Sequence, residues 1–257
     1  MSSEAPYGTW QSLITAELLT EGTVRLGEIV VDGDSVWWAE SRPNEGGRTV
    51  IVCDGIDQLS AEANVRTLVH EYGGGAWWVS DGVLVYSEYT DQRLYKLEKG
   101  KDSVALTPAL RKPGGDRYAD GRLTQDRAWY VCVRERHSEE ICEPVNEVVA
   151  VALDGSEQIK TLVSGPDFVA APRPSPDGSQ LAWIQWNHPE MPWDNTELWV
   201  ADFDGEKLSS ARCIGAEGES FFQPEWRSDG ILHVVTDRDG WWHLYRFDGN
   251  RLISLTS

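Results

Sequence analysis

Short apolar runs alternate with polar turns along most of the chain, and the runs have the length of β-strands rather than helices. Asp-Gly between two apolar runs is a strong hairpin signal, because both residues tolerate the positive φ of a type I′ turn. One series of such pairs is Asp32-Gly33, Asp81-Gly82, Asp177-Gly178 and Asp229-Gly230, and a second series of turns is Asp54-Gly55, Lys99-Gly100, Asp154-Gly155, Asp204-Gly205 and Asp248-Gly249. The pattern predicts an all-β chain built from successive hairpins.

The two turn series repeat at intervals of about 50 residues, with the weaker turn Thr124–Arg127 in register where the first series skips a step. Strands are expected at Ala170–Pro174, Gln180–Gln185, Glu197–Asp202 and Leu208–Ile214, and again at Phe222–Trp226, Ile231–Thr236, His243–Phe247 and Leu252–Leu255. A repeat of four short antiparallel strands indicates a β-propeller. The expected division is an N-terminal arm in 1–26 and five blades in 27–69, 70–117, 118–166, 167–218 and 219–257.

Two segments fit the repeat less well. Ser12–Leu19 is apolar enough to form a strand, whereas Leu59–Val69 fits a short helix, although its Val65–Val69 portion suits a strand equally well. Most of the 13 tryptophans fall in or beside expected strands, where wide, flat side chains fill the gap between neighbouring blades. We therefore expect the tryptophans to serve packing rather than ligand stacking.

The charge balance excludes some partners. The 257 residues include 42 Asp+Glu against 23 Lys+Arg, a net charge of −19, which disfavours nucleic acid and anionic membrane surfaces. The chain has no membrane-spanning apolar stretch and no secretory signal pattern at its start, so we expect it in the cytoplasm. Four scattered cysteines predict reduced, buried thiols, since the spacing of Cys132, His137 and Cys142 fits no zinc pattern. No metal and no cofactor is expected.

The propeller topology separates two sides of the chain. In a four-stranded antiparallel blade, the first–second and third–fourth turns share one side, and these are the tight turns here. The second–third loops and the links between blades share the other side, and they are long at 41–48, 69–75, 134–146, 187–196 and 215–223. Long loops on a rigid scaffold carry binding residues, so this side is the candidate working face.

No catalytic motif is present in the chain. There is no Gly-x-Ser-x-Gly nucleophile elbow and no phosphate-binding loop, and His70-Glu71 lacks the second histidine of a zinc-protease motif. The triple glycine Gly73–Gly75 is interpreted as backbone crowding near the propeller axis, where a Cβ would clash. We expect the isolated chain to hydrolyse no peptide or ester.

Five segments then occur in a familiar order: His70–Gly75, Asp91–Tyr95, Trp186–Asp194, Gln223–Trp226 and Asp237–Trp242. Together they resemble the N-terminal propeller of prolyl oligopeptidase-type (S9) serine peptidases, in the acylaminoacyl-peptidase and dipeptidyl-aminopeptidase-like branch. The resemblance runs from about Gly8 to the last residue and implies a seven-bladed propeller followed by an α/β-hydrolase domain with the Ser, Asp and His. Five blades are expected here, with that domain as the partner and exposed blade edges open to self-association.

The resemblance also implies a gate that admits short peptides and loops that recognise the N-terminal end of the substrate. A carboxylate on such loops can accept charge-assisted hydrogen bonds from a peptide's ammonium group. The candidates on the loop side are Glu71, Glu143, Asp194 and Glu219 for that group, Asn187 and His188 for peptide carbonyls, and Trp193 for stacking on or capping a pocket. Each has an alternative role in loop stability, and Asp194 is equally placed for an Asx turn with Thr196 or Glu197.

Two other functions remain open. One is an independent binding propeller of the translocation-associated type, which a periplasmic signal would favour. The other is a propeller lactonase or glycosidase, which needs inward carboxylates or metal ligands where each blade begins. The segments there include Tyr72–Trp77, Tyr118–Leu123, Ala170–Pro174 and Gln223–Trp226, and they offer few such ligands.

Overall fold

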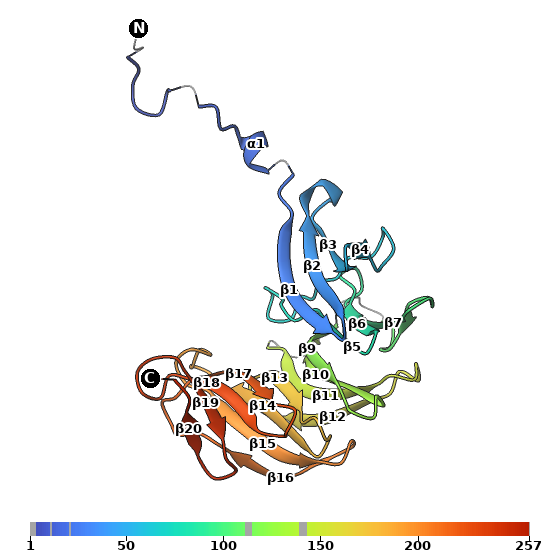
Figure 1. Ribbon diagram of the computed structural model, residues 1–257, viewed down its shortest axis with the longest axis vertical. Helices are drawn as coiled ribbons and strands as arrows, with labels where there is room; N and C mark the ends of the chain where they lie inside the picture. Colours follow the sequence, from blue (N-terminus) through green and yellow to red (C-terminus); the bar gives the residue numbers. More distant parts are fainter. Residues whose placement is uncertain (1–3, 11, 21, 111–114, 139–142, 257) are drawn as a thin grey trace. The chain divides into compact units, whose positions relative to one another are not determined.

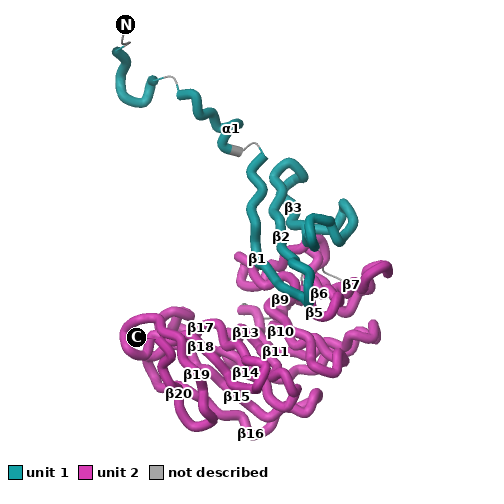
Figure 2. Tube along the Cα trace, in the orientation of Figure 1, with its two compact units in different colours: residues 1–64 teal, residues 65–257 magenta. Residues whose placement is uncertain are grey.

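The computed structural model describes residues 4–10, 12–20, 22–110, 115–138 and 143–256 (Figure 1). These residues form five four-stranded antiparallel sheets, numbered here in chain order, with very little helix. The chain divides into two compact units, Met1–Asn64 with the first sheet and Val65–Ser257 with the other four (Figure 2). The predicted fold class, an all-β propeller of four-stranded blades, is confirmed.

The first unit contains one short helix and one sheet. Its elements are α1 (Ala16–Thr20), β1 (Arg25–Asp32), β2 (Ser35–Arg42), the 3₁₀ turn η1 (Pro43–Glu45), β3 (Arg48–Cys53) and β4 (Ile56–Asp57), with the sheet in the order β1-β2-β3-β4. The strand predicted at Ser12–Leu19 is wrong, because Ala16–Thr20 is helical. Thr15 explains the helix start, since its Oγ1 accepts the Leu18 N–H at 3.1 Å, as an N-cap does.

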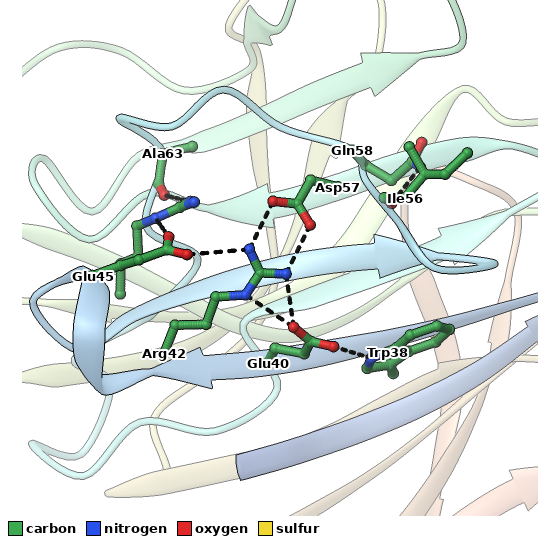
Figure 3. Close-up of polar contacts among 9 residues, drawn as sticks. Trp38, Glu40, Arg42, Glu45, Ile56, Asp57, Gln58 and Ala63 are labelled. Carbon is green, nitrogen blue, oxygen red and sulfur yellow. Dashed lines mark hydrogen bonds and ion pairs between the residues drawn. The ribbon is translucent and has the colours of Figure 1, made fainter. Parts of the chain in front are cut away.

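Arg42 at the end of β2 joins the parts of the first unit (Figure 3). Its guanidinium donates to Asp57 of β4 at 2.7 and 2.8 Å, to Glu40 at 2.7 and 2.9 Å, and to Glu45 of η1 at 3.4 Å. These bonds lower the pKa of Asp57, whereas the pKa of Glu40 is lowered first by the Trp38 indole N–H and then by Arg42. The cluster tethers the two-residue strand β4, whose backbone pairing alone is short.

The second unit contains four sheets, each formed by strands in chain order. The strands are β5 (Trp77–Ser80), β6 (Val83–Ser87), β7 (Leu94–Glu98), β8 (Val104–Ala105), β9 (Asp116–Leu123), β10 (Trp129–Arg136), β11 (Val145–Ala152), β12 (Ile159–Ser164), β13 (Phe168–Pro174), β14 (Gln180–Trp186), β15 (Glu197–Phe203), β16 (Leu208–Cys213), β17 (Phe221–Trp226), β18 (Leu232–Thr236), β19 (His243–Phe247) and β20 (Leu252–Ser254). The eight strands predicted in the fourth and fifth sheets agree closely with these bounds. Leu59–Val69 is neither helix nor strand, and only Val65 forms an isolated bridge, to Glu88.

The hairpin turns are of two kinds. At Asp54-Gly55 and Asp81-Gly82 both residues have positive φ, as the predicted type I′ turn requires. At Asp32-Gly33 and Asp177-Gly178 only the glycine does, so these turns have a different geometry. The hairpin prediction holds in both cases, because a glycine that adopts positive φ without strain is what each turn needs.

The core of the second unit lies between successive sheets. β10 and β11 are buried along nearly their whole length, as strands covered on both faces are. The Trp183 and Trp199 rings stack with centroids 6.0 Å apart, which supports the predicted packing role of strand tryptophans. Trp193, Trp241 and Trp242 lie in connections instead and are exposed.

Candidate functional site

The loops of the second unit gather on the side opposite its tight turns, as the strand order requires. The second–third connections are 88–93, 137–144, 187–196 and 237–242, and the links between sheets include 165–167 and 214–220. The segment 70–75 precedes β5 and lies on the same side by this topology. The loop side therefore carries every predicted site residue.

The segment before β5 has an unusual backbone. His70 and Glu71 have φ of 54° and 65°, and Gly73, Gly74 and Gly75 also have positive φ. A Cβ on Gly73 would lie 2.5 Å from the Thr67 carbonyl oxygen, and one on Gly75 would lie 2.8 Å from the Asp120 Cα. Backbone crowding, as predicted, explains two of the three glycines, and the φ of 117° explains Gly74.

A buried carboxylate holds this turn in place. The Glu135 side chain is 3% exposed, and its Oε2 accepts the His70 backbone N–H at 2.7 Å. Its Oε1 lies 3.2 Å from Arg117 Nη1 and 2.6 Å from His137 Nε2. Arg117 also donates to Glu71 Oε1 at 2.7 Å, a bond that is the main cause of the lowered Glu71 pKa. Glu71 is thus an exposed, ionised carboxylate with a fixed position.

Aromatic rings connect this turn to the 187–196 loop. Phe168 stacks on Trp186 with centroids 5.2 Å apart, and the His70 ring meets Phe168 edge-on at 5.5 Å. The His188 ring also meets Phe168 edge-on, with centroids 5.0 Å apart. Tyr72, which is 77% exposed, extends the row with its ring centroid 5.9 Å from that of His70. The row brings Glu71 and His188 into one region of the loop side.

The start of the 187–196 loop is held by reciprocal hydrogen bonds. Asn187 Oδ1 accepts the Asp167 N–H at 2.8 Å, and Asp167 Oδ2 accepts the His188 N–H at 2.9 Å. Asn187 therefore has a demonstrated role in loop structure. Trp193 and Asp194 lie further along the loop with exposed side chains.

The end of this loop is tied to Glu219. The Thr196 N–H, which an Asx turn at Asp194 would have used, donates instead to the Glu219 carbonyl at 2.9 Å. The Glu219 side chain is only 9% exposed, and its Oε1 accepts from Arg238 at 3.1 Å. Glu219 is therefore not on the open surface, unlike Glu71 and Asp194. Glu143, which lies beside residues outside the described part, is exposed.

A second charged cluster lies on the innermost strands, and sequence reasoning missed it. Arg173 of β13 donates to Asp120 Oδ1 of β9 at 2.8 Å and to Glu225 Oε1 of β17 at 3.0 Å. Arg122 of β9 donates to the same Glu225 oxygen at 3.3 Å, and its guanidinium lies 3.5 Å from the centre of the Trp78 ring. The cluster spans three sheets.

A repeated backbone bulge creates this cluster. Asp120, Ala171 and Gln223 each have φ near 50° at an irregularity of the first–second strand pairing. The residue two positions later is Arg122, Arg173 or Glu225, so all three fall at the same place in the repeat. Aligning the units at this level of detail would have been the signal that reveals them.

Burial acts on the pKa of both arginines. Desolvation lowers the pKa of Arg122, and the neighbouring Arg173 adds to this. Burial also acts to lower the pKa of Arg173, but attraction by Asp120 and Glu225 outweighs it, so that pKa is raised. Asp120 and Glu225 are the inward carboxylates that a propeller glycosidase would need, and here arginines bind both.

The cysteines differ in their exposure. Cys132 is fully buried, and burial raises the pKa of its thiol. Cys53 is half-buried and Cys213 is exposed, so the expectation of buried thiols fails for Cys213; Cys142 lies outside the described residues. No group of three or more metal-ligating side chains occurs in the part of the chain that is described. Nor does any helix there have the length and apolar character to cross a membrane.

Comparisons with known proteins identify relatives among solved structures. No family model and no curated protein matches the chain. It is similar over 100% of its length to a Mycobacterium tuberculosis puromycin-hydrolyzing peptidase, with 38% identity and a TM-score of 0.88, and to a puromycin hydrolase, with 37% identity and a TM-score of 0.88. The chain spans 42% of each of these proteins.

A more distant likeness shows the fold alone. A prolyl endopeptidase matches 91% of the chain with 12% identity and a TM-score of 0.62, and an oligogalacturonate lyase matches 87% with 15% identity and a TM-score of 0.63. The two matches that cover all of this chain at 38% and 37% identity carry the assignment, together with the five four-stranded sheets. The chain belongs to the prolyl oligopeptidase-type (S9) peptidase family, as its N-terminal β-propeller.

Proposed function

We propose that this chain is the gating and substrate-selecting propeller of a serine peptidase that cleaves short peptides. Cleavage would be carried out by an α/β-hydrolase domain of the same polypeptide. The observation that supports this most strongly is the similarity of the whole chain to 42% of each of two puromycin-hydrolysing enzymes. The grouping of long connections on one side of the second unit supports it further, because such loops are suited to face a substrate.

Within this function, we assign Glu71 to the free ammonium group of the peptide. The carboxylate side chain is 76% exposed, and Arg117 uses only its Oε1 among the described contacts. The second oxygen is available to a charge-assisted donor, which forms shorter and stronger hydrogen bonds than a neutral one. Tyr72 and His188 flank the same region, and Trp193 and Asp194 complete the proposed surface with Asn187 and Glu219 as supports of the loop.

The test compares free and acylated substrates on the polypeptide that carries the propeller and the hydrolase domain. Glu71→Gln should lower kcat/KM for an aminoacyl chromogenic substrate by about 10- to 100-fold, since a charged hydrogen bond contributes about 1.5–3 kcal/mol. The N-acetylated substrate should be cleaved as by the wild type. The matched control is Glu206→Gln, which removes another exposed carboxylate with one ion pair, to Lys160 at 2.7 Å, at a tight turn on the other side.

Two results would contradict the assignment. An equal loss on both substrates would mean that Glu71 acts through the fold, and no loss on either would mean that it does not meet the substrate.

The gate itself is tested with peptides of increasing length. Cleavage should fall steeply between short peptides and a folded protein, and equal cleavage of both would refute a gating role.

A further inference from the structure

A groove lies between β16 of the fourth sheet and β19–β20 of the fifth, within the second unit. Its volume is about 710 Å³, within the range of pockets that bind small organic molecules. Arg212, Arg238 and Arg251 contribute to its lining, as do the aromatic side chains of Tyr245 and Phe247. None of the residues assigned above to peptide binding is part of this lining.

The cations of the groove are not all paired. Three guanidinium groups line it against one carboxylate, that of Asp239, while Glu219 and Asp248 pair with Arg238 and Arg251. The Asp239 carboxylate already accepts the hydroxyl group of Tyr245. In a protein of net charge −19, a guanidinium that no carboxylate neutralises marks a place on the surface that can attract an anion.

Two of the arginines are held over aromatic rings. The Arg212 guanidinium carbon lies 5.4 Å from the centre of the Phe247 ring, and that of Arg238 lies 5.7 Å from the centre of the Tyr245 ring. Tyr245 and Phe247 are two residues apart on one face of β19, so the rings are about 7 Å apart along the strand. A guanidinium lying over a ring keeps its N–H edge available to a bound anion.

Arg212 carries the strongest indication of a ligand. It is exposed, and within the described residues its side chain makes no hydrogen bond and no ion pair. Arg238 has one such partner, Glu219, and Arg251 lies 3.7 Å from Asp248. Arg212 is thus an uncommitted cation that stacking orients toward the groove.

We propose that this groove binds an organic anion. Its acidic group, a carboxylate or a phosphate, lies between Arg212 and Arg238, where two guanidinium edges can donate charge-assisted hydrogen bonds. Its apolar or aromatic body lies against Tyr245 and Phe247. The volume of the groove matches a molecule of this kind better than a bare inorganic ion, which would leave the aromatic lining uncovered.

Three probes separate charge from apolar contact: 1-naphthyl phosphate carries both, 1-naphthol only the ring, and inorganic phosphate only the charge. Isothermal titration calorimetry on the full chain should give a Kd for 1-naphthyl phosphate at least about tenfold lower than that for 1-naphthol or inorganic phosphate. Arg212→Gln should weaken its binding about tenfold, which corresponds to the loss of one charged hydrogen bond. The control Arg227→Gln removes the same charge from a side chain 58% exposed and outside this groove, and binding should be unchanged.

A second variant places the probe. Arg238 lines the same groove with its guanidinium over the Tyr245 ring, so Arg238→Gln should also weaken the binding of 1-naphthyl phosphate about tenfold. Equal binding by wild type and Arg212→Gln would overturn the proposal. So would equal binding of 1-naphthol and 1-naphthyl phosphate, or unchanged binding by Arg238→Gln.

Discussion

Replacing Arg173 by methionine tests how the innermost strands of the second unit are held together. Methionine keeps much of the apolar stem and removes the guanidinium that joins Asp120 of β9 to Glu225 of β17. The Arg173 side chain is only 9% exposed, so its partners lose a buried cation. Removing one partner of a buried ion pair typically costs about 3–5 kcal/mol, because the other charge is left without compensation.

Solvent and a neighbouring arginine reduce the free-energy cost of removing Arg173. The Asp120 side chain is 30% exposed and that of Glu225 is 55% exposed, so water solvates both carboxylates in part. Arg122 also stays 3.3 Å from Glu225 and continues to pair with it. We therefore expect Arg173→Met to lower the free energy of unfolding by about 2–3 kcal/mol. For a chain of this size that corresponds to a fall in Tm of about 4–12 °C.

The assay is urea denaturation followed by tryptophan fluorescence, extended to a double-mutant cycle. Asp120→Asn removes the charge but keeps an oxygen for the Ala171 N–H, which Asp120 Oδ2 accepts at 2.9 Å. In this background Arg173→Met should cost at least about 1 kcal/mol less than in the wild type. Arg227→Met, at an exposed ion pair, should cost less than about 0.5 kcal/mol. A loss at Arg173 below about 1 kcal/mol, or the same loss in the Asp120→Asn background, would refute the reasoning.

Three further results are expected. Gly121→Ala places a Cβ 2.3 Å from ring carbons of the buried Tyr130, so urea denaturation should show a loss of more than about 2 kcal/mol, and an unchanged midpoint would contradict the packing. The Ser175 hydroxyl, followed by the Ser179 amide and hydroxyl, lowers the Asp177 pKa to about 2 from 3.8, so the stabilising effect of this carboxylate is present above pH 4 and lost as the pH falls through 2. Wild type and Asp177→Asn should therefore differ in stability near pH 6 and converge at pH 2, and a constant difference would be inconsistent with this linkage. The buried Cys132 thiol, whose pKa burial raises, should resist N-ethylmaleimide until the protein unfolds, and rapid native labelling would show that it is accessible.

The strands and hairpins could be predicted because the forces that define them are local. Asp81-Gly82 forms a turn with positive φ at both residues, and His243–Phe247 is a strand with the predicted bounds. The repeat of about 50 residues then identified the blade as the unit of the fold. At Ala16–Thr20 the same approach was wrong, because apolar content was weighed above the capping residue Thr15 and good helix formers.

The candidate site could be predicted only in part. The topology assigned Glu71, His188 and Trp193 to one side, since strand order alone decides which connections share a side. The sequence did not show that Glu219 is buried beside Arg238, 19 positions further along the chain. Nor did it show that Arg117 and Glu135 hold the turn at Glu71 and His70, because these pairs lie 46 and 65 positions apart.

By itself, the sequence determined the all-β class, the four-stranded blade, the side that carries the long loops and the absence of a nucleophile elbow in this chain. These properties depend on neighbouring residues and on the alternation of apolar and polar positions. Only the tertiary structure decided which charges meet. Arg173 reaches Asp120 and Glu225 because bulges on three successive sheets turn these side chains toward one another. Such contacts depend on the packing of whole sheets, and their energy rests on burial, which no single strand has before the sheets assemble.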